Sequence, residues 1–373
     1  SVCRELLDRC RLETPSGLTT IAARPGEREP AGLWEVAAVL EGLPDAFEPR
    51  ELDAVCRAFA EGQDERGVFP STVRPDGTVD FRPPGADSGS VVALDNAISM
   101  VALAWHAMQL DPEPDLLPDV APRLVKGLEA LPRNERTHLV SVPVHEADRY
   151  VALSFAPGIR MAGDLLYPSL LHVQACQQLA DIMQNLGRDG DSDMWRAEAQ
   201  LVAKRIRMYF WDKGPGLFRA ATRQCREHDL WASVHSVFLN VATSGQLVAI
   251  ARYCKENYDS VVHEGYLRGL PESDYWEATE TPRGEFENGG YWNGAAGWMV
   301  YAVDIIQPAL ADRILLDLAE AYVAEGTHRF ISEKGTRRFP DYLPSAALPL
   351  GGIHKMAMRR RKRLEESSML SEF

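Results

Sequence analysis

The stretch LLYPSLLHVQACQQLADIMQNLG, residues 165–187, decides the class of fold to which this chain belongs. Its apolar residues recur every three or four positions from Leu166 to Leu186, so one side of a helix is continuously apolar. Gly187 then ends the helix as a C-terminal capping glycine does. A turn and a second amphipathic segment, residues 194–209, follow directly. The stretch therefore predicts two antiparallel helices joined by a short turn.

The same helical hairpin recurs along the chain at intervals of about 65 residues. The further pairs are predicted at 94–110 with 117–131, 229–241 with 247–258, and 292–306 with 310–322. Weaker helical patterns lie at 2–10, 33–43, 52–62 and 346–358. Because strands and helices do not alternate, a doubly wound sheet is excluded. The sequence predicts an all-α fold, an (α/α)6 toroid in which one helix of each pair lines the centre.

The domain organisation follows from the same pattern. Residues 1–355 are expected to form one (α/α)6 domain. The remaining residues, 356–373, begin with the basic run Arg359 to Arg363 and are expected to form a flexible, solvated tail.

Composition excludes several classes of partner. The formal net charge of −14 is spread along the chain, whereas a nucleic-acid groove needs clustered Lys and Arg. Residues 230–251 lack formal charge, but their polar residues and a Thr-Ser-Gly turn exclude a membrane span. The six cysteines show no CxxC spacing and the acidic residues form no compact ligand loop, so we expect no metal and no cofactor. The absence of an apolar presequence favours the cytoplasm.

Acidic, amide and aromatic residues gather where the inner helices are expected to begin. These starts, at Asp95, Asp164, Asp229 and Trp292, should point toward one rim of the toroid, where the long connections also lie. Sugars are bound by aromatic rings stacked on their CH faces and by carboxylates and amides that hold their hydroxyls. The residues expected to form such a subsite are Trp231, Glu287, Asn288, Tyr291, Trp292 and His228.

Four segments occur in an order typical of one superfamily: AGDLLYPSL at 162–170, FWDKGPGLF at 210–218, HDLWA at 228–232 and ENGGYWNG at 287–294. In this order they resemble the six-hairpin glycosidases, and within them the bacterial α-glucosidases related to processing glucosidase I. The resemblance covers roughly residues 90–355. It implies an O-glycosidase that acts by inversion on a small carbohydrate, with no cofactor.

The resemblance also implies the catalytic carboxyl groups. The general base of the family falls at Glu333, in the loop before the last helix. The acid is expected in the loop at 153–160, which here reads LSFAPGIR and contains no carboxylate. Asp164 and Asp229 are the candidates that could replace this acid, and Asp148 is the next candidate after them. Simpler interpretations are that both aspartates cap helices and that Glu333 is a turn residue.

Two other functions stay open. The same barrel serves sugar epimerases and isomerases that use histidines, and His228 beside Asp229, with His235 further on, fits that chemistry. A chain that kept the barrel but lost the acid would bind sugar without catalysis. The sequence leaves the sugar, the linkage and the oligomeric state open.

Overall fold

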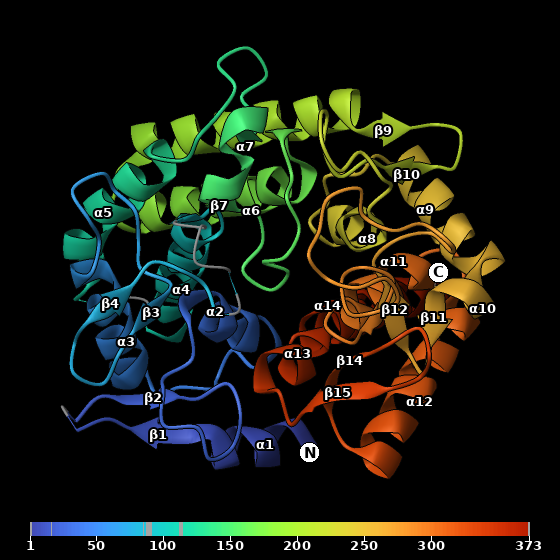
Figure 1. Cartoon of the computed structure of the whole chain (residues 1–373), viewed down its shortest axis with the longest axis horizontal. Helices are drawn as coiled ribbons and strands as arrows, with labels where there is room; N and C mark the ends of the chain where they lie inside the picture. The colour runs from blue at the N-terminus through green and yellow to red at the C-terminus, as the bar shows by residue number, and fades with distance from the viewer. Residues whose placement is uncertain (1, 16, 85, 87–91, 112–114, 372–373) are drawn as a thin grey trace.

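The fold is a ring of helical hairpins (Figure 1). The computed structural model describes residues 2–15, 17–84, 86, 92–111 and 115–371, with side chains through residue 366. The inner helices are α2 (Leu33–Gly42), α4 (Asn96–Leu110), α6 (Leu166–Asn185), α8 (Leu230–Phe238), α11 (Ala296–Asp304), and α13 (Leu343–Ala347) followed by α14 (Pro349–Ser371). The outer helices are α1 (Val2–Cys10), α3 (Pro49–Glu61), α5 (Leu117–Glu129), α7 (Asp189–Tyr209), α9 (Ser244–Glu256) and α12 (Pro308–Glu325).

The two layers differ in burial as a toroid requires. Every residue of α8 and of α11 is buried, because each helix is covered on all sides. The outer helix α7 buries only a stripe from Ser192 to Ile206, with members three to four positions apart. Neighbouring inner helices contact one another around the ring, and α13 and α14 pack on α2 to close it. The predicted all-α toroid is confirmed.

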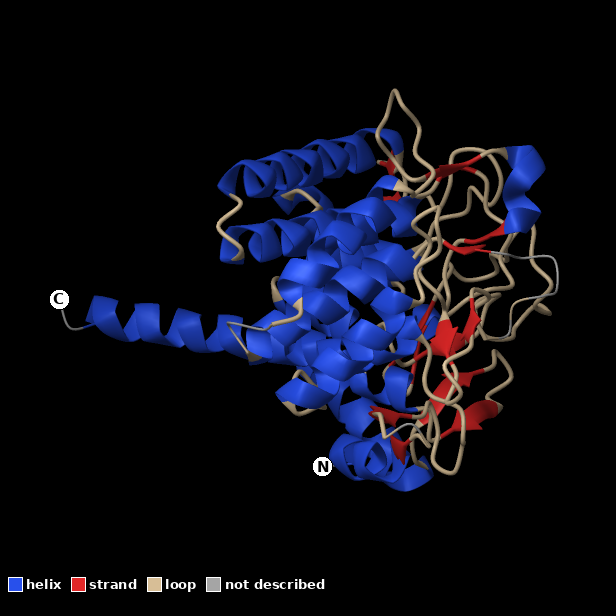
Figure 2. Cartoon of the chain, turned by 90° about the vertical axis from the view of Figure 1, so that its left-hand side faces the viewer, coloured by secondary structure: helices blue, strands red, loops and turns tan. Residues whose placement is uncertain are grey.

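Short strands and long connections gather at one end of the ring, here named the loop face (Figure 2). The largest sheet is antiparallel, in the order β11 (Val262–His263), β12 (Tyr266–Arg268), β13 (Tyr291–Trp292), β14 (His328–Ile331) and β15 (Arg337–Pro340). Trp292 pairs with Leu267 on one side and with Phe330 on the other. The expectation that Trp292 begins an inner helix is therefore wrong, because sheet pairing delays α11 until Ala296.

Smaller elements complete the loop face. The two-stranded pairs are β1 (Arg11–Glu13) with β2 (Thr19–Ile21), β3 (Thr72–Val73) with β4 (Val79–Asp80), β5 (Val92–Ala93) with β7 (Tyr150–Val151), β6 (Ser141–Val142) with β8 (Gly163–Asp164), and β9 (Trp211–Asp212) with β10 (Leu217–Phe218). The short helices are α10 (Tyr258–Val261) and a 3₁₀ turn, Val144–Arg149. Among the described residues, no helix has the length and apolarity to cross a membrane.

The C-terminal segment leaves the ring as a helix. Helix α14 continues to Ser371 and projects from the side opposite the loop face (Figure 2). Arg359 and Arg360 of the basic run form ion pairs with the buried carboxylate of Asp304. Part of this run is therefore tied to the ring, and a flexible unit beginning at residue 356 stays a prediction.

Glycines allow the helices that close the ring to touch backbone to backbone. A Cβ atom on Gly297 of α11 would lie 2.1 Å from the carbonyl oxygen of Pro349, and one on Gly352 would lie 2.1 Å from the Gly297 oxygen. On α2, a Cβ at Gly42 would lie 1.8 Å from the Ala347 oxygen. Any side chain at these positions would push α13 and α14 away from the ring.

Replacing Gly297 with Ala should destabilise the protein. The added methyl group would overlap backbone atoms of α14. Overpacking of this kind costs about 1–3 kcal/mol, which exceeds the stabilisation expected from the higher helix propensity of alanine. Chemical denaturation measures the change in the free energy of unfolding. Gly190→Ala in α7 is the control, since its Cβ would meet no atom within 4 Å. Equal stability of the two variants would contradict the close contact.

Candidate functional site

The inner helices begin at the loop face, where the site was expected. Asp229 caps α8: its Oδ1 atom accepts a 2.8 Å hydrogen bond from the Ala232 amide, and the residue is only 2% exposed. Burial raises its pKa to about 7, although the amides of Ala232 and Trp231 oppose the shift. Asp229 is thus both a helix cap and a carboxyl group that keeps its proton to near-neutral pH.

A cluster of aromatic rings fills the ring axis just below the loop face. This axial cluster consists of Phe155, Trp231, Phe286 and Trp292. Phe155 stacks on Trp292 with ring centroids 4.6 Å apart and planes 14° apart, and Trp231 meets Trp292 edge-on at 5.0 Å. Both tryptophan nitrogens are occupied, Trp231 by the Leu267 oxygen and Trp292 by Ser345. The two tryptophans predicted to line a sugar subsite are therefore packed in the core.

The position of Phe155 is set by a buried carboxylate. Asp95, at the start of α4, accepts hydrogen bonds from the amide and the hydroxyl of Ser154 at 2.7 and 2.6 Å. Arg329 of β14 donates to the Phe155 carbonyl oxygen at 2.5 Å. Burial raises the pKa of Asp95 to about 6 against these bonds from Ser154. The loop at 153–160, where the family places its acid, thus directs an aromatic ring into the axis.

Asp164 lies in strand β8, and the residue that caps α6 is Leu165. Its two carboxylate oxygens accept hydrogen bonds from Asn134 at 2.9 Å and from Thr137 at 3.1 Å. These contacts fix the connection between α5 and β6. The structure therefore gives Asp164 a loop-ordering contact, and the interpretation of Asp164 as a helix cap is wrong.

Glu333 occupies the turn between β14 and β15, with 38% of its side chain exposed. Partial burial favours a higher pKa for Glu333, but hydrogen bonds from Arg268 and Tyr275 and the Arg268 charge outweigh it, so its pKa is lowered. The distances are 3.0 Å from Arg268 Nη1 to Oε1 and 2.9 Å from the Tyr275 hydroxyl to Oε2. This carboxylate is held ionised.

Glu287 and Asn288 brace the long connection between β12 and β13. Glu287 is 3% exposed and accepts from the Thr281 hydroxyl, and burial raises its pKa. Asn288 accepts from the Trp276 amide at 2.9 Å and donates to the Thr281 oxygen at 2.7 Å. Both side chains have partners within the loop, which is a structural role.

His228 and Tyr291 have hydrogen-bond partners outside the axial cluster. The His228 Nε2 atom lies 3.1 Å from Asp212 of β9, which also pairs with Arg219. The Tyr291 hydroxyl reaches the Ser260 oxygen at 3.4 Å. The nine residues predicted for the site are therefore held by separate contacts within the fold.

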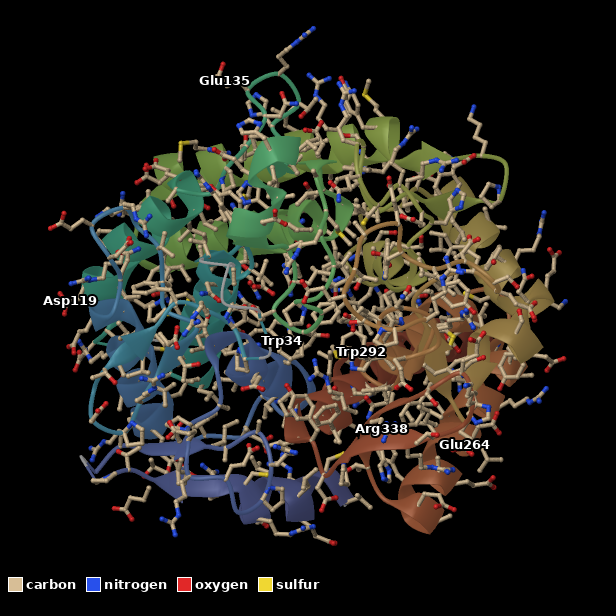
Figure 3. The ribbon with its side chains drawn as sticks, in the orientation of Figure 1. Trp34, Asp119, Glu135, Glu264, Trp292 and Arg338 are labelled. Carbon is tan, nitrogen blue, oxygen red and sulfur yellow. The ribbon has the colours of Figure 1, made fainter. Side chains whose placement is uncertain are left out.

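A cavity of about 430 Å³ does open at the loop face, between the N-terminal segment and the starts of α2 and α4. We name it the rim cavity. The residues that line it and carry polar or aromatic groups include Trp34, Glu35, Asn96, Ser154, Arg329 and Tyr342. Seen from the loop face, Trp34 and Trp292 lie near the middle of the ring (Figure 3).

The walls of the rim cavity offer hydrogen-bonding groups to a ligand. Among the described residues, the buried Asn96 Oδ1 and Arg329 Nε atoms have no hydrogen-bond partner. Glu35 is fixed from both sides, because it accepts 2.6 Å hydrogen bonds from the Tyr342 hydroxyl and the Gly32 amide. Such groups can bind the hydroxyls of a polyol.

The residues that line this cavity carry no motif that predicts a role for them in the sequence. The aromatic–acidic pair Trp34-Glu35 at the start of a predicted helix was the available signal. It matches the pattern used to nominate Trp231 and Trp292, but Tyr342, the partner of Glu35, is 307 positions away in sequence.

Solved structures share this architecture. A GH63 mannosylglycerate hydrolase from Thermus thermophilus, in complex with Tris and D-glycerate, aligns with a TM-score of 0.66 at 16% identity, covering 94% of this chain and 98% of that one. An uncharacterized conserved protein from the same organism aligns at 0.65 and 16%, with the same coverage. The rhamnosidase from Klebsiella oxytoca with rhamnose bound aligns at 0.65 and 14%, covering 95% of this chain and 63% of that one.

The chain has the six-hairpin glycosidase fold. The resemblance read from the sequence is thus confirmed at the level of fold. No protein-family model and no curated protein sequence matches the chain.

The titration of Asp229 should be visible in stability. Its folded-state pKa, about 7, exceeds the ordinary 3.8, so between these values the folded protein keeps a proton that the unfolded chain releases. Its contribution is complete below pH 4 and is lost as the pH rises toward 7. Asp229→Asn removes this loss while retaining a capping oxygen. Denaturation at several pH values should show that the stability of the variant falls less than that of the wild type.

The control is Asp193→Asn, at an exposed position of α7. It should change with pH as the wild type does. Parallel curves for wild type and Asp229→Asn would show that Asp229 is ionised throughout this range.

Proposed function

We propose that the chain hydrolyses a small glycoside bound in the rim cavity. The observation that carries the proposal is the position of this cavity at the loop face of a barrel shared, over 94% of its length, with a mannosylglycerate hydrolase. Its volume falls within the roughly 300–1,000 Å³ range of small-molecule pockets. The lining combines aromatic rings with donors, acceptors and carboxylates, which is the chemistry that sugar binding needs.

The proposed pose follows from the lining residues. The Trp34 indole offers a face for the CH groups of a sugar ring. Asn96 Oδ1 accepts from one hydroxyl and Arg329 Nε donates to another, because both atoms are without partners among the described residues. Ser154 lies at the same wall, on the loop that Asp95 anchors.

Hydrolysis with inversion needs two carboxyl groups of unequal pKa. A protonated one gives its proton to the glycosidic oxygen as the bond to the anomeric carbon breaks, and an ionised one takes a proton from the attacking water. Asp229 as acid and Glu333 as base fit this division, since the pKa of Asp229 is raised to about 7 and that of Glu333 is lowered. Asp164 remains the alternative acid.

A competing carboxyl group lies in the cavity itself. Neither Asp229 nor Glu333 lines the rim cavity, and a proton donor must come within hydrogen-bond reach of the reacting oxygen. Glu35 lines the cavity, with its two oxygens bonded to the Gly32 amide and the Tyr342 hydroxyl. The assignment of Asp229 and Glu333 therefore requires the loop face to open over Asp229, whereas assignment of Glu35 does not.

One observation favours a second candidate, a sugar-binding protein without hydrolytic activity. The loop in which the family carries its acid here directs Phe155 into the axis, where its ring stacks on Trp292. A chain in which a buried aromatic residue occupies the place of the catalytic acid would still bind sugar in the pocket but would not hydrolyse it.

The epimerase alternative receives less support at this end of the barrel. His228 is bonded to Asp212 of β9, and the described residues that line the rim cavity include no histidine.

The decisive measurement is release of free sugar from nitrophenyl glucosides, mannosides and rhamnosides, from disaccharides and from mannosylglycerate. We expect turnover of at least one substrate. Glu333→Gln and Asp229→Asn should each lower kcat/KM by about 10²–10⁴, the usual contribution of a general acid or base. Glu135→Gln is the control, because Glu135 lies at the edge of the ring, far from the axis (Figure 3).

Three other outcomes separate the alternatives. Turnover that survives both substitutions but disappears in Glu35→Gln would indicate that Glu35, at the wall of the rim cavity, is a catalytic carboxyl group. Sugar binding by calorimetry without turnover would support the binding protein. Absence of both binding and turnover across the panel would contradict the proposed function.

A further inference from the structure

A second cavity, of about 470 Å³, lies inside the ring and reaches the ends of the inner helices opposite the loop face. We name it the lumen cavity. All the inner helices through α11, together with α14, contribute to its wall, and its polar and aromatic lining includes Glu41, His106, Gln178, His235, Trp298 and Lys355. Trp34 lines both cavities and therefore forms the partition between them.

The lumen cavity contains buried polar atoms that nothing in the described part of the chain satisfies. Both ring nitrogens of His235, a residue 1% exposed, have no hydrogen-bond partner, and the same holds for Oε1 of Gln178, which is 8% exposed. Burying a polar group without a hydrogen-bond partner costs free energy, so we expect each of these groups to have a partner. Both residues line the cavity, so a ligand inside it can supply that partner.

Contacts within the protein hold His235 in place by its ring faces alone. The imidazole stacks on Trp298 at a centroid distance of 4.0 Å and 24° between planes, and lies 5.2 Å from the ring of Tyr167. Stacking uses the faces of the ring and leaves its two nitrogen-bearing edges free. The imidazole ring is therefore fixed in position, while both of its nitrogens remain available to hydrogen-bond a ligand.

The charges around the cavity suit an uncharged ligand. Burial lowers the pKa of His235 to about 3 and that of His106 to about 4, so both are neutral at pH 7. Glu41 is bonded to the Trp298 indole, and burial raises its pKa to about 7. The ammonium group of Lys355 donates to the Phe238 carbonyl oxygen and lies 4.5 Å from the Phe238 ring. Asp181 also lines the cavity, and its carboxylate lies 3.6 Å from the Arg196 guanidinium. The wall that the described residues form therefore holds no cluster of like charges that would recruit an ion.

The amide content of the wall indicates which neutral molecule fits. Gln174, Gln177, Gln178 and Asn240 line the cavity, together with the hydroxyl of Ser99. Amides both donate and accept, so they match a molecule that carries hydroxyls around its whole edge. Aromatic side chains at Trp105 and Tyr167 supply apolar surface for its faces.

We propose that the lumen cavity is a second binding site, separate from the rim cavity, for a free monosaccharide or another uncharged cyclic polyol. His235 and Gln178 hydrogen-bond its hydroxyls, and Trp34 separates it from any glycoside in the rim cavity. No bond is made or broken there.

The test is calorimetric titration of the full chain with D-glucose, D-mannose, L-rhamnose and myo-inositol. At least one should bind. His235→Phe keeps a flat stacked ring but removes both nitrogens, and Gln178→Met keeps the length of the side chain but removes the amide. Each should weaken binding at least tenfold. Ala102→Phe, which inserts a ring into the cavity from α4, should abolish it.

Two controls keep the result interpretable. Gln109→Met, at an exposed position near the end of α4, and Glu35→Gln, in the rim cavity, should leave the affinity unchanged. Circular dichroism melting shows whether each variant is folded, and His235→Phe should melt no lower than wild type because it removes unpaired buried groups. Binding that persists unchanged in His235→Phe, Gln178→Met and Ala102→Phe, or that is lost only in Glu35→Gln, would overturn the proposal. Absence of binding by all four polyols would overturn it as well.

Discussion

The ring depends on backbone contact between the helices that close it. Gly42, Gly297 and Gly352 let α2, α11 and the α13–α14 segment approach until carbonyl oxygens occupy the space where side chains would begin. Residues 343 positions apart thereby become neighbours, as in the hydrogen bond from the Cys3 thiol to the Ala346 oxygen. Both cavities exist because this closure encloses an axis.

The axis is divided by aromatic packing. Phe155 stacks on Trp292, lies 5.4 Å from Trp34, and is held there by the bonds between Ser154 and Asp95. Of these three rings, Trp34 lines both the rim cavity and the lumen cavity. The buried carboxylate of Asp95, at the start of α4, thus helps to fix the backbone that carries Phe155.

Electrostatics and accessibility favour different candidates for the proposed acid and base. Asp229 and Glu333 have pKa values displaced in the opposite directions that acid and base catalysis requires, and the causes are burial for one and a buried arginine for the other. Glu35 has access to the rim cavity. Perturbed pKa values mark functional sites and structural ion pairs alike, which is why geometry has to decide between them.

The sequence by itself determined the hairpins and their order. Helical periodicity is local, so residues 165–187 predict α6 and Gly187 its end without knowledge of any other segment. The same locality explains the failures. Asp164 and Trp292 look like helix starts in sequence, but both lie in strands. Asp164 pairs with Ser141 of β6 and Trp292 pairs with Leu267 of β12, contacts that helical periodicity does not reveal.

The tertiary structure alone decided where the open space lies. Glu35 meets Tyr342 across 307 positions, and Trp34, His235 and Gln178 come from three different hairpins. An aromatic residue next to an acid looks the same in sequence whether it lines a pocket or fills a core. Trp34 and Trp231 share that pattern, and only the packing of every inner helix at once leaves the first at a cavity and the second buried.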